Sequence, residues 1–308
     1  MGRVVIVGGG LAGASTAEAL REDGYDGEVV LLAAEPHLPY DRPPLSKGFL
    51  KGETALDEVT LHDQQWYDDQ QITVRTGVQV TGITTSAREV TLEGGERIGY
   101  DTLVLATGSE PRRLTLPGAE LDGVLTLRRL EDSERLKDEL ARAEGRRLVL
   151  IGGGWIGLEV GSAFRDAGAE VTVLEHAEQP LLAALGPVMG AYFADLHRRH
   201  GTDVRTGATV RSIKAGSNPT SVGSVVLGDG TEVPADLVLV GVGATPRTEL
   251  AETAGLEVDN GIVVDAQGRT SDPTVFATGD IANFPDPVFG RIRIEHWAHA
   301  LNHPKAVA

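Results

Sequence analysis

Residues 3–13 read RVVIVGGGLAG, and this stretch decides the fold. Its four apolar residues 4–7 predict a buried parallel strand, and Gly8, Gly10 and Gly13 follow with GxGxxG spacing where a helix should begin. In such a turn the first glycine permits the tight bend, the second lets backbone amides approach a pyrophosphate, and the third allows close packing of helix on strand. In a chain with 39 glycines, one such triplet also fits an ordinary glycine-rich turn.

Composition and charge bound the class of protein. A chain of 308 residues is long enough for two domains, and no apolar run approaches the roughly 20 residues of a membrane-spanning helix. The start shows no signal peptide, so we expect a cytoplasmic protein. A net charge of −17 argues against nucleic-acid binding, which needs clustered Lys and Arg. These residues include no cysteine, which excludes disulfides, thiolate metal sites and catalytic thiols among them, and we predict no metal site.

The stretch after the glycines completes a first βαβ unit. Residues 11–22 predict a helix and residues 28–32 an apolar strand. A carboxylate is expected just beyond such a strand, where it accepts hydrogen bonds from a ribose. Glu35, 22 residues after Gly13, is the candidate, and the alternative is a solvated loop glutamate.

A proline-rich segment, residues 37–47, follows this unit. Its three prolines exclude a regular helix or a central strand and predict a stiff loop. Such a loop can hold Arg42 and Lys47 in fixed places beside whatever the glycine turn binds, although both cations also fit a solvated surface loop.

The same pattern occurs a second time, 144 residues further along the chain. Residues 148–151 predict a buried strand, Gly152, Gly154 and Gly157 repeat the GxGxxG spacing, and Glu175 ends a further strand 18 residues later. Two copies in matching order predict two dinucleotide sites, unless one copy is a structural relic. Two dinucleotides side by side serve one main purpose, which is the passage of a hydride between them.

A third strand-to-glycine turn, residues 274–280, ends in Asp280. Ligands of open α/β sheets lie beyond the carboxyl ends of the strands, so Asp280 can face the sugar chain of a cofactor. The alternative role is that of a helix N-cap. A helix is expected to follow Glu295 and Trp297.

With these residues assembled, the chain resembles the FAD-dependent, NADH-linked ferredoxin reductases of oxygenase systems, the putidaredoxin reductase-like family. The most specific segment is PHLPYDRPPLSKGFL at residues 36–50, supported by TLVLATGSEPR, LRRLED, IGGGWIGLEVG and VFATGDIA. The resemblance implies an α/β fold with two Rossmann-like dinucleotide-binding domains of the glutathione-reductase type. Residues 1–113 and 246–308 would form a discontinuous FAD-binding domain and residues 114–245 the NAD-binding domain. Relatives continue into a C-terminal interface domain, to which nothing in these 308 residues corresponds.

The resemblance also implies cofactor contacts and roles. Asp280 would face the ribityl chain of FAD, and Trp297 would lie near the pyrimidine end of the flavin, where the positive end of its helix favours developing negative charge. Lys47 and Glu159 resemble the catalytic ion pair of the family beside the flavin, which acts by positioning and electrostatics. The cofactor-binding positions are Gly8, Gly10, Ala12, Gly13, Glu35, Arg42, Lys47, Val80, Ala106, Arg128, Gly152, Gly154, Ile156, Gly157, Glu159, Glu175, Gly243, Asp280 and Trp297. One departure is Ala34, where relatives often carry an acidic residue.

The implied function is electron transfer from NADH through FAD to a [2Fe-2S] ferredoxin. Glu175 favours NADH, because a carboxylate repels the 2′-phosphate of NADPH, and the neighbouring His176 softens this preference. Two alternatives stay open: a rubredoxin reductase, and an NADH-sensing flavoprotein with slow turnover that resembles apoptosis-inducing factor. Local cations, among them Lys51, Arg291 and Arg293, are candidates for a patch that receives an acidic ferredoxin.

Overall fold

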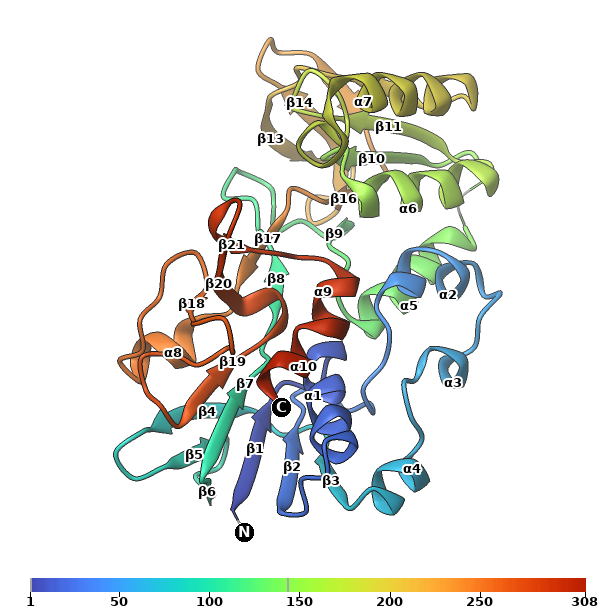
Figure 1. Ribbon diagram of the computed structural model, residues 1–308. Coiled ribbons are helices and arrows are strands. Elements are labelled where there is room, and N and C mark those ends of the chain that lie inside the picture. The colour runs from blue at the N-terminus through green and yellow to red at the C-terminus, as the bar shows by residue number, and fades with distance from the viewer. Residues whose placement is uncertain (1, 143) are drawn as a thin grey trace. The chain divides into compact units, whose positions relative to one another are not determined.

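The computed structural model describes residues 2–142 and 144–308, which fold into two compact units (Figure 1). The first unit contains the described residues up to Asp41 together with Leu56–Glu110 and Thr245–Ala308, and the second contains Arg42–Ala55 and Pro111–Ala244. The chain therefore enters and leaves the second unit twice.

A parallel five-stranded sheet with the order β19-β7-β1-β2-β3 forms the centre of the first unit. Its strands are β1 (Arg3–Val7), β2 (Glu28–Leu32), β3 (Ile72–Arg75), β7 (Thr102–Leu105) and β19 (Val275–Ala277). Both faces are buried, because alternate residues of one strand belong to different cores. Val5 and Val7 pack in one hydrophobic cluster, whereas Val4 and Ile6 pack in another.

Different elements cover the two faces of this sheet. Helix α1 (Leu11–Glu22) supplies Ala17 and Leu20 to the cluster that contains Val4, and the C-terminal helices α9 (Trp297–Asn302) and α10 (Pro304–Val307) contact α1 (Figure 1). The opposite face is covered by an antiparallel meander that contributes Val90 and Leu92. The meander consists of β4 (Val80–Thr84), β5 (Glu89–Leu92) and β6 (Arg97–Gly99).

The second unit repeats this plan. Its parallel sheet has the order β12-β11-β10-β16-β9, and a second meander packs on it through Ile213, Val225 and Val233. The sheet strands are β9 (Val124–Leu125), β10 (Arg147–Ile151), β11 (Glu170–Leu174), β12 (Asp203–Arg205) and β16 (Leu237–Val240), and the meander strands are β13 (Val210–Ala215), β14 (Val222–Leu227) and β15 (Glu232–Pro234). The helices are α5 (Leu130–Leu140), α6 (Trp155–Asp166) and α7 (Leu182–Arg199), with a kink in α7 at Gly186 and Pro187.

The remaining elements are short. They are η1 (Pro43–Ser46), α2 (Gly48–Lys51), α3 (Leu56–Val59), α4 (Gln64–Asp69), β8 (Ser109–Pro111), β17 (Ala244–Pro246), α8 (Glu249–Thr253), β18 (Ile262–Val263), η2 (Gly279–Ile281), β20 (Ala282–Asp286) and β21 (Gly290–Arg293). β8 and β17 pair as a two-stranded sheet where the chain passes between the units. Within the described residues, no helix has the length and apolar character needed to cross a membrane.

The compact units and the predicted domains differ most in residues 42–55, and otherwise by one to three residues at the boundaries. Residues 42–55 were expected in the FAD-binding domain, but they cluster with residues 111–244. The reason is a set of tertiary contacts with α5: Ser133 Oγ donates a hydrogen bond to the Leu45 carbonyl at 2.6 Å, and Lys137 Nζ lies 5.5 Å from the centre of the Phe49 ring. The local sequence carries no sign of these contacts, and the assignment of a cofactor to each domain stays a prediction.

Candidate functional site

The first glycine turn joins β1 to α1, as the sequence predicts. Gly8 has a φ of +127°, and a Cβ atom there would lie 2.1 Å from the Ala106 carbonyl oxygen. A Cβ atom at Gly13 would lie 1.9 Å from the Gly8 carbonyl oxygen. Glycine is therefore required at both positions, because the turn is tight and the helix packs closely on the strand.

Gly10 has a different environment and is the N-cap of α1. A Cβ atom there would meet nothing within 4 Å, and the first turn of α1 carries no acidic side chain. The first N–H groups of α1, which include that of Ala12, thus lie next to open space at Gly10. They form the positive end of the helix dipole. This arrangement suits the approach of an anionic pyrophosphate.

The segment around Asp280 lies next to this turn within the first unit. Gly279 has a φ of +73°, and a Cβ atom there would lie 2.6 Å from the Ala12 Cβ, so η2 passes directly over the first turn of α1. Ser109 Oγ donates a hydrogen bond to Asp280 Oδ2 at 3.1 Å, and Arg293 donates to the Asp280 carbonyl at 3.0 Å. The structure therefore brings Asp280 to the glycine turn across more than 260 residues of sequence.

Three other predicted FAD contacts of the first unit have distinct environments. Glu35 is half-buried and accepts a hydrogen bond from the Tyr40 hydroxyl. Trp297 is 44% exposed at the start of α9, and its Nε1 donates to Asp41 Oδ1 at 2.9 Å. The Val80 side chain is 4% exposed and packs in the core beneath the meander, so its backbone is the part available to a ligand.

The second glycine turn joins β10 to α6 with the same geometry. Gly152 has a φ of +107°, and a Cβ atom there would lie 2.3 Å from the Gly241 carbonyl oxygen. A Cβ atom at Gly157 would lie 2.6 Å from the Gly152 carbonyl oxygen, whereas one at Gly154 would have no neighbour closer than 3.9 Å. Gly154 is again the N-cap of a helix without acidic residues in its first turn.

Other predicted residues lie at the edge of this turn. Ile156, in the first turn of α6, is 42% exposed. Gly243 follows the carboxyl end of β16 with a φ of +99°, and its carbonyl accepts a hydrogen bond from the N–H of Arg112 at 2.9 Å. Both positions border the place where ligands of parallel sheets bind.

The two candidate carboxylates do not occupy equivalent positions. Glu175 is the first residue after β11, and its N–H donates to the Arg205 carbonyl; in the first unit the corresponding residue is Ala33, which donates to the Arg75 carbonyl. Glu35 lies two residues beyond Ala33, where its carbonyl accepts from Gly77. Glu35 follows Gly13 by 22 residues, whereas Glu175 follows Gly157 by only 18. This unequal spacing already indicated in the sequence that the two positions are not equivalent.

Glu175 is held by the turn that it borders. Its Oε2 accepts a hydrogen bond from the Gly153 N–H at 2.6 Å, and its Oε1 accepts from the Ala177 N–H at 2.7 Å. Backbone donors on both oxygens fix the carboxylate at the strand end, where a ribose is expected.

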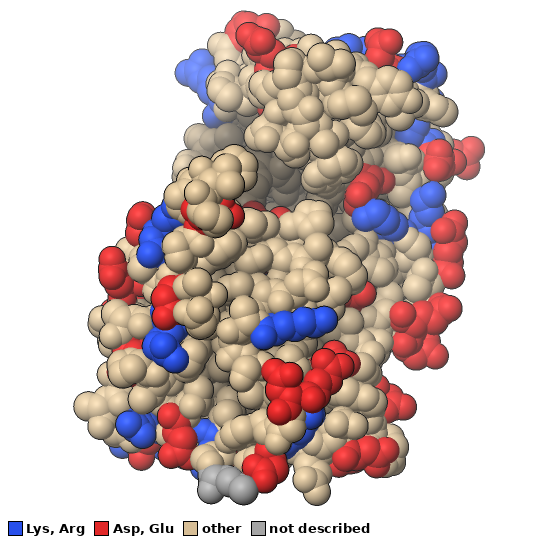
Figure 2. All heavy atoms as spheres, in the orientation of Figure 1, with Lys and Arg blue, Asp and Glu red and all other residues tan. Residues whose placement is uncertain are grey.

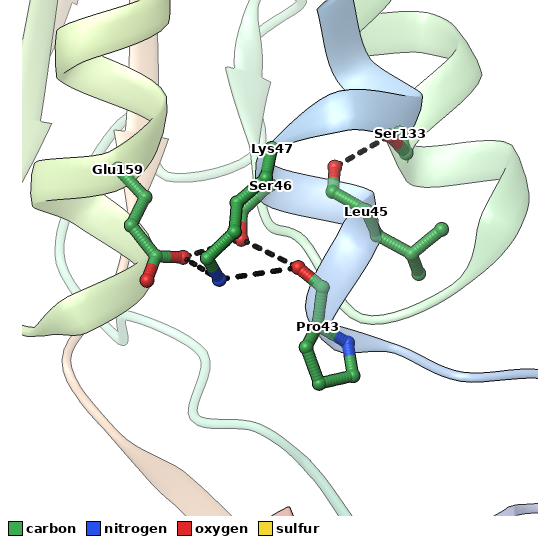
Figure 3. A network of polar contacts seen from close by, with 6 residues as sticks. All are labelled: Pro43, Leu45, Ser46, Lys47, Ser133 and Glu159. Carbon is green, nitrogen blue, oxygen red and sulfur yellow. Dashed lines mark hydrogen bonds and ion pairs between the residues drawn. The ribbon is translucent and has the colours of Figure 1, made fainter. Parts of the chain in front are cut away.

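Lys47 and Glu159 form an ion pair within the second unit (Figure 3). Lys47 Nζ lies 2.7 Å from Glu159 Oε2 and 3.2 Å from the Pro43 carbonyl oxygen. Ser46 Oγ donates a hydrogen bond to the same carboxylate oxygen at 2.5 Å. The family resemblance implies the Lys47–Glu159 pair, whereas Ser46 carries no sequence signal, because nothing distinguishes a lone serine from any other loop residue.

The predicted cations are already engaged in contacts. Arg42 donates to the Arg128 carbonyl, Lys51 lies 3.5 Å from Asp166, and Arg291 donates to the Val264 and Asn283 carbonyls. Arg293 pairs with Glu295, and its side chain is 10% exposed. On the face shown in Figure 2, Lys and Arg stand among Asp and Glu rather than in one basic area. The pair with Glu295 and this low exposure leave the Arg293 side chain little surface for contact with a partner protein.

Two half-buried histidines next to Asp280 were not anticipated. His299 and His303 stack with ring centres 4.7 Å apart, and both rings stack on Phe284. His303 Nδ1 lies 3.0 Å from Thr278 Oγ1, and burial lowers the pKa of His303 to about 4. Burial also lowers the pKa of His299. Their spacing of four residues on an expected helix was the available signal.

Within the described residues no group of three or more His, Asp or Glu side chains could hold a metal ion. The two glycine turns, each at the carboxyl edge of its own parallel sheet, define a class of protein with two dinucleotide-binding folds. The chain belongs to the pyridine nucleotide-disulphide oxidoreductase family, whose signature matches residues 2–303.

Individual relatives cover nearly the whole chain. It is 42% identical over 308 residues to the anthranilate 1,2-dioxygenase system ferredoxin–NAD(+) reductase component of Burkholderia cepacia. The match covers 99% of this chain and 74% of that relative. The chain is 40% identical over 306 residues to a rubredoxin–NAD(+) reductase of Pseudomonas putida, with 99% and 78% covered. The reductase in a solved covalent putidaredoxin reductase–putidaredoxin complex superimposes with a TM-score of 0.95 at 39% identity, with 99% and 74% covered.

Proposed function

We propose that this chain is a flavoprotein reductase that takes a hydride from NADH onto FAD and passes single electrons to a [2Fe-2S] ferredoxin of an oxygenase system. The observation that carries the proposal is the duplicated glycine turn, with an open N-cap glycine at Gly10 and again at Gly154. Relatives of about 40% identity named as ferredoxin or rubredoxin reductases support the reaction class.

The residues of the first unit fit FAD. Gly10, Ala12 and the helix dipole of α1 would bind the pyrophosphate, and Asp280 would accept hydrogen bonds from a polyol chain. Trp297, held by Asp41, would border the ring system. Bound there, the flavin supplies the conversion of a two-electron hydride donor into one-electron steps.

The residues of the second unit fit NADH. Gly154 and the start of α6 would bind its pyrophosphate, and the fixed Glu175 carboxylate would accept the ribose hydroxyls and repel a 2′-phosphate. Lys47 and Glu159 would orient the nicotinamide half by hydrogen bonding and charge. They would not act as an acid or a base, because hydride transfer needs neither. The chain has no cysteine in these 308 residues, so its own side chains do not supply the disulfide chemistry of the family name.

Rubredoxin is the second candidate acceptor, because a rubredoxin reductase matches this chain at 40% identity over 306 residues. A slowly turning NADH sensor is the remaining alternative, since a Lys–Glu pair beside a flavin suits either role. We also propose that the protein works in the cytoplasm, where NADH is generated.

The experiment begins with the purified protein, which should be yellow and release FAD rather than FMN on denaturation. NADH oxidation is then measured against a panel of [2Fe-2S] ferredoxins and rubredoxins. Flavin bleaching within milliseconds of mixing with NADH, followed by catalytic ferredoxin reduction, supports the proposal. A persistent charge-transfer complex with slow turnover favours the sensor, faster turnover with rubredoxin favours the second acceptor, and protein that cannot be loaded with FAD contradicts the assignment.

A further inference from the structure

Ser46 is the buried member of the group that holds Glu159. Ser46 as a whole residue is 5% exposed, whereas the side chain of Lys47 is 52% exposed and that of Glu159 is 26% exposed. Both donors bind one oxygen, Glu159 Oε2, at 2.5 Å and 2.7 Å (Figure 3). The carboxylate therefore has one buried and one solvent-exposed support.

These two supports differ in how firmly they fix the carboxylate. A lysine side chain has four rotatable bonds, and an exposed ion pair is screened by water and costs side-chain entropy. A serine hydroxyl has a single side-chain torsion, and a hydrogen bond to a charged acceptor is stronger than one to a neutral acceptor. The buried serine is thus the better constraint on the position of Glu159.

The backbone around Ser46 is fixed as well. Ser46 ends η1, in which Pro43 and Pro44 restrict φ, and the neighbouring Leu45 carbonyl accepts the Ser133 hydroxyl. The Ser46 hydroxyl carries one proton, for which the Pro43 carbonyl at 3.4 Å competes with Glu159 at 2.5 Å. The shorter distance assigns that proton to the carboxylate.

We propose that Ser46 is a positioning residue for Glu159, an inference that rests on the proposed function. With both donors on Oε2, the carboxylate plane is set and Oε1 is left as the oxygen that faces away from η1 (Figure 3). Glu159 lies four residues beyond Trp155, about 6 Å along α6 from the helix start. It is therefore held in one orientation close to the turn that binds the coenzyme.

The first test replaces the hydroxyl in the FAD-loaded protein. Ser46→Ala should lower the limiting rate of flavin reduction by NADH about tenfold, because the carboxylate is no longer oriented. The Kd for NAD+, measured by calorimetry, should change by no more than about twofold, because the glycine turn and Glu175 are intact. The matched control is Thr248→Ala, which removes a buried hydroxyl that donates to another glutamate, Glu252, at 2.6 Å; it should lower the Tm and leave the reduction rate within about twofold.

A double-mutant cycle then separates positioning from stability. In a Glu159→Ala background, Ser46→Ala should have no further effect on the reduction rate, because its target is absent. A crystal structure of Ser46→Ala should show Glu159 displaced or in several conformations. An unchanged reduction rate, an equal loss in the Glu159→Ala background, or an unmoved Glu159 overturns the proposal.

Lys47→Ala supplies the second variant if Ser46→Ala does not fold. In its crystal structure Glu159 should keep its place on Ser46, and a displaced Glu159 would show that the lysine is the support instead. The failure of the proposed function has a different signature, because the wild-type protein would then show no flavin reduction by NADH at all.

Discussion

The Oε2 atom of Glu175 accepts a hydrogen bond from the Gly153 N–H at 2.6 Å, inside the glycine turn of the second unit. The residue at the corresponding strand end of the first unit is Ala33, which has no carboxylate to offer. Two turns of the same geometry thus differ in charge at the strand end, where a ribose is expected. We expect this difference to give the second unit a preference for NADH.

Replacing Glu175 tests that preference. Glu175→Gln keeps the size of the side chain but removes the charge that repels a 2′-phosphate. We expect the ratio of kcat/KM for NADH to that for NADPH to fall about tenfold, which corresponds to about 1.4 kcal/mol. Glu178→Gln makes the same charge change at an exposed position nearby and should leave the ratio unaltered. An unchanged ratio in Glu175→Gln would remove the residue from coenzyme selection.

The two open N-cap glycines, Gly10 and Gly154, allow the predicted cofactor of each unit to be tested. Gly10 and Gly154 have φ values of −87° and −78°, which alanine adopts without strain, and their Cβ positions are free of close contacts. Gly10→Ala should therefore fold but bind FAD weakly, because the methyl group occupies the space of the pyrophosphate. Gly154→Ala should keep its FAD and show a raised KM for NADH. Released flavin and steady-state kinetics measure both effects, and the reverse outcome would exchange the two assignments.

Gly13→Ala gives the structural counterpart of that experiment. Its Cβ atom would lie 1.9 Å from the Gly8 carbonyl oxygen, so α1 must move away from β1. We expect a loss of stability of at least about 2 kcal/mol, seen as a lower midpoint of urea unfolding in apoprotein. Gly10→Ala, measured alongside, should unfold at nearly the wild-type midpoint. Equal midpoints for the two variants would contradict the close packing seen at Gly13.

Lys47→Ala separates a redox role from a structural one. The ion pair with Glu159 is exposed on the lysine side, so it contributes only about 0–1 kcal/mol to stability, and the Tm should fall by no more than about 4 °C. The limiting rate of flavin reduction should fall about tenfold, because the positive charge that would orient the nicotinamide half of NADH is lost. Lys51→Ala, which breaks the pair with Asp166 in the same unit, is the control. A normal rate of flavin reduction in Lys47→Ala would show that Lys47 is only a solvated cation of the surface loop.

The two half-buried histidines, His299 and His303, predict a loss of stability in acid. Burial, followed by the effect of His299, lowers the pKa of His303 to about 4, below the value of about 6.5 in the unfolded chain. Between these values the unfolded state binds more protons, so the free energy of unfolding decreases as the pH falls from about 6.5 to 4, by about 3 kcal/mol in total. His299 acts in the same direction, and the neighbouring Asp280 opposes its shift.

His303→Gln removes this titration. Urea unfolding between about pH 7 and 4.5 should give a shallower loss of stability than in the wild type. His176→Gln, at an exposed position, serves as the control. Parallel curves for His303→Gln and the wild type would show that the His303 ring does not govern the acid response.

The two central parallel strands and their glycine turns could be predicted from the sequence. The apolar runs at residues 4–7 and 148–151, each followed by GxGxxG, specify a buried parallel strand, a tight turn and a helix, because these depend on local conformation and hydrophobic pattern. The repeated pattern also gave the order of the elements in each unit.

Tertiary structure alone decided which distant residues meet. Packing against α5 carries residues 42–55 into the second unit, where Ser46 reaches Glu159 across 113 positions of sequence. Asp280 reaches the first glycine turn only because β19 joins the edge of the sheet beside β7. Such contacts result from the burial of whole elements rather than from any local pattern. The strands and turns could be predicted from the residues, and the Lys47–Glu159 pair from the family resemblance, but not the contact of Ser46 with Glu159 or that of Ser109 with Asp280.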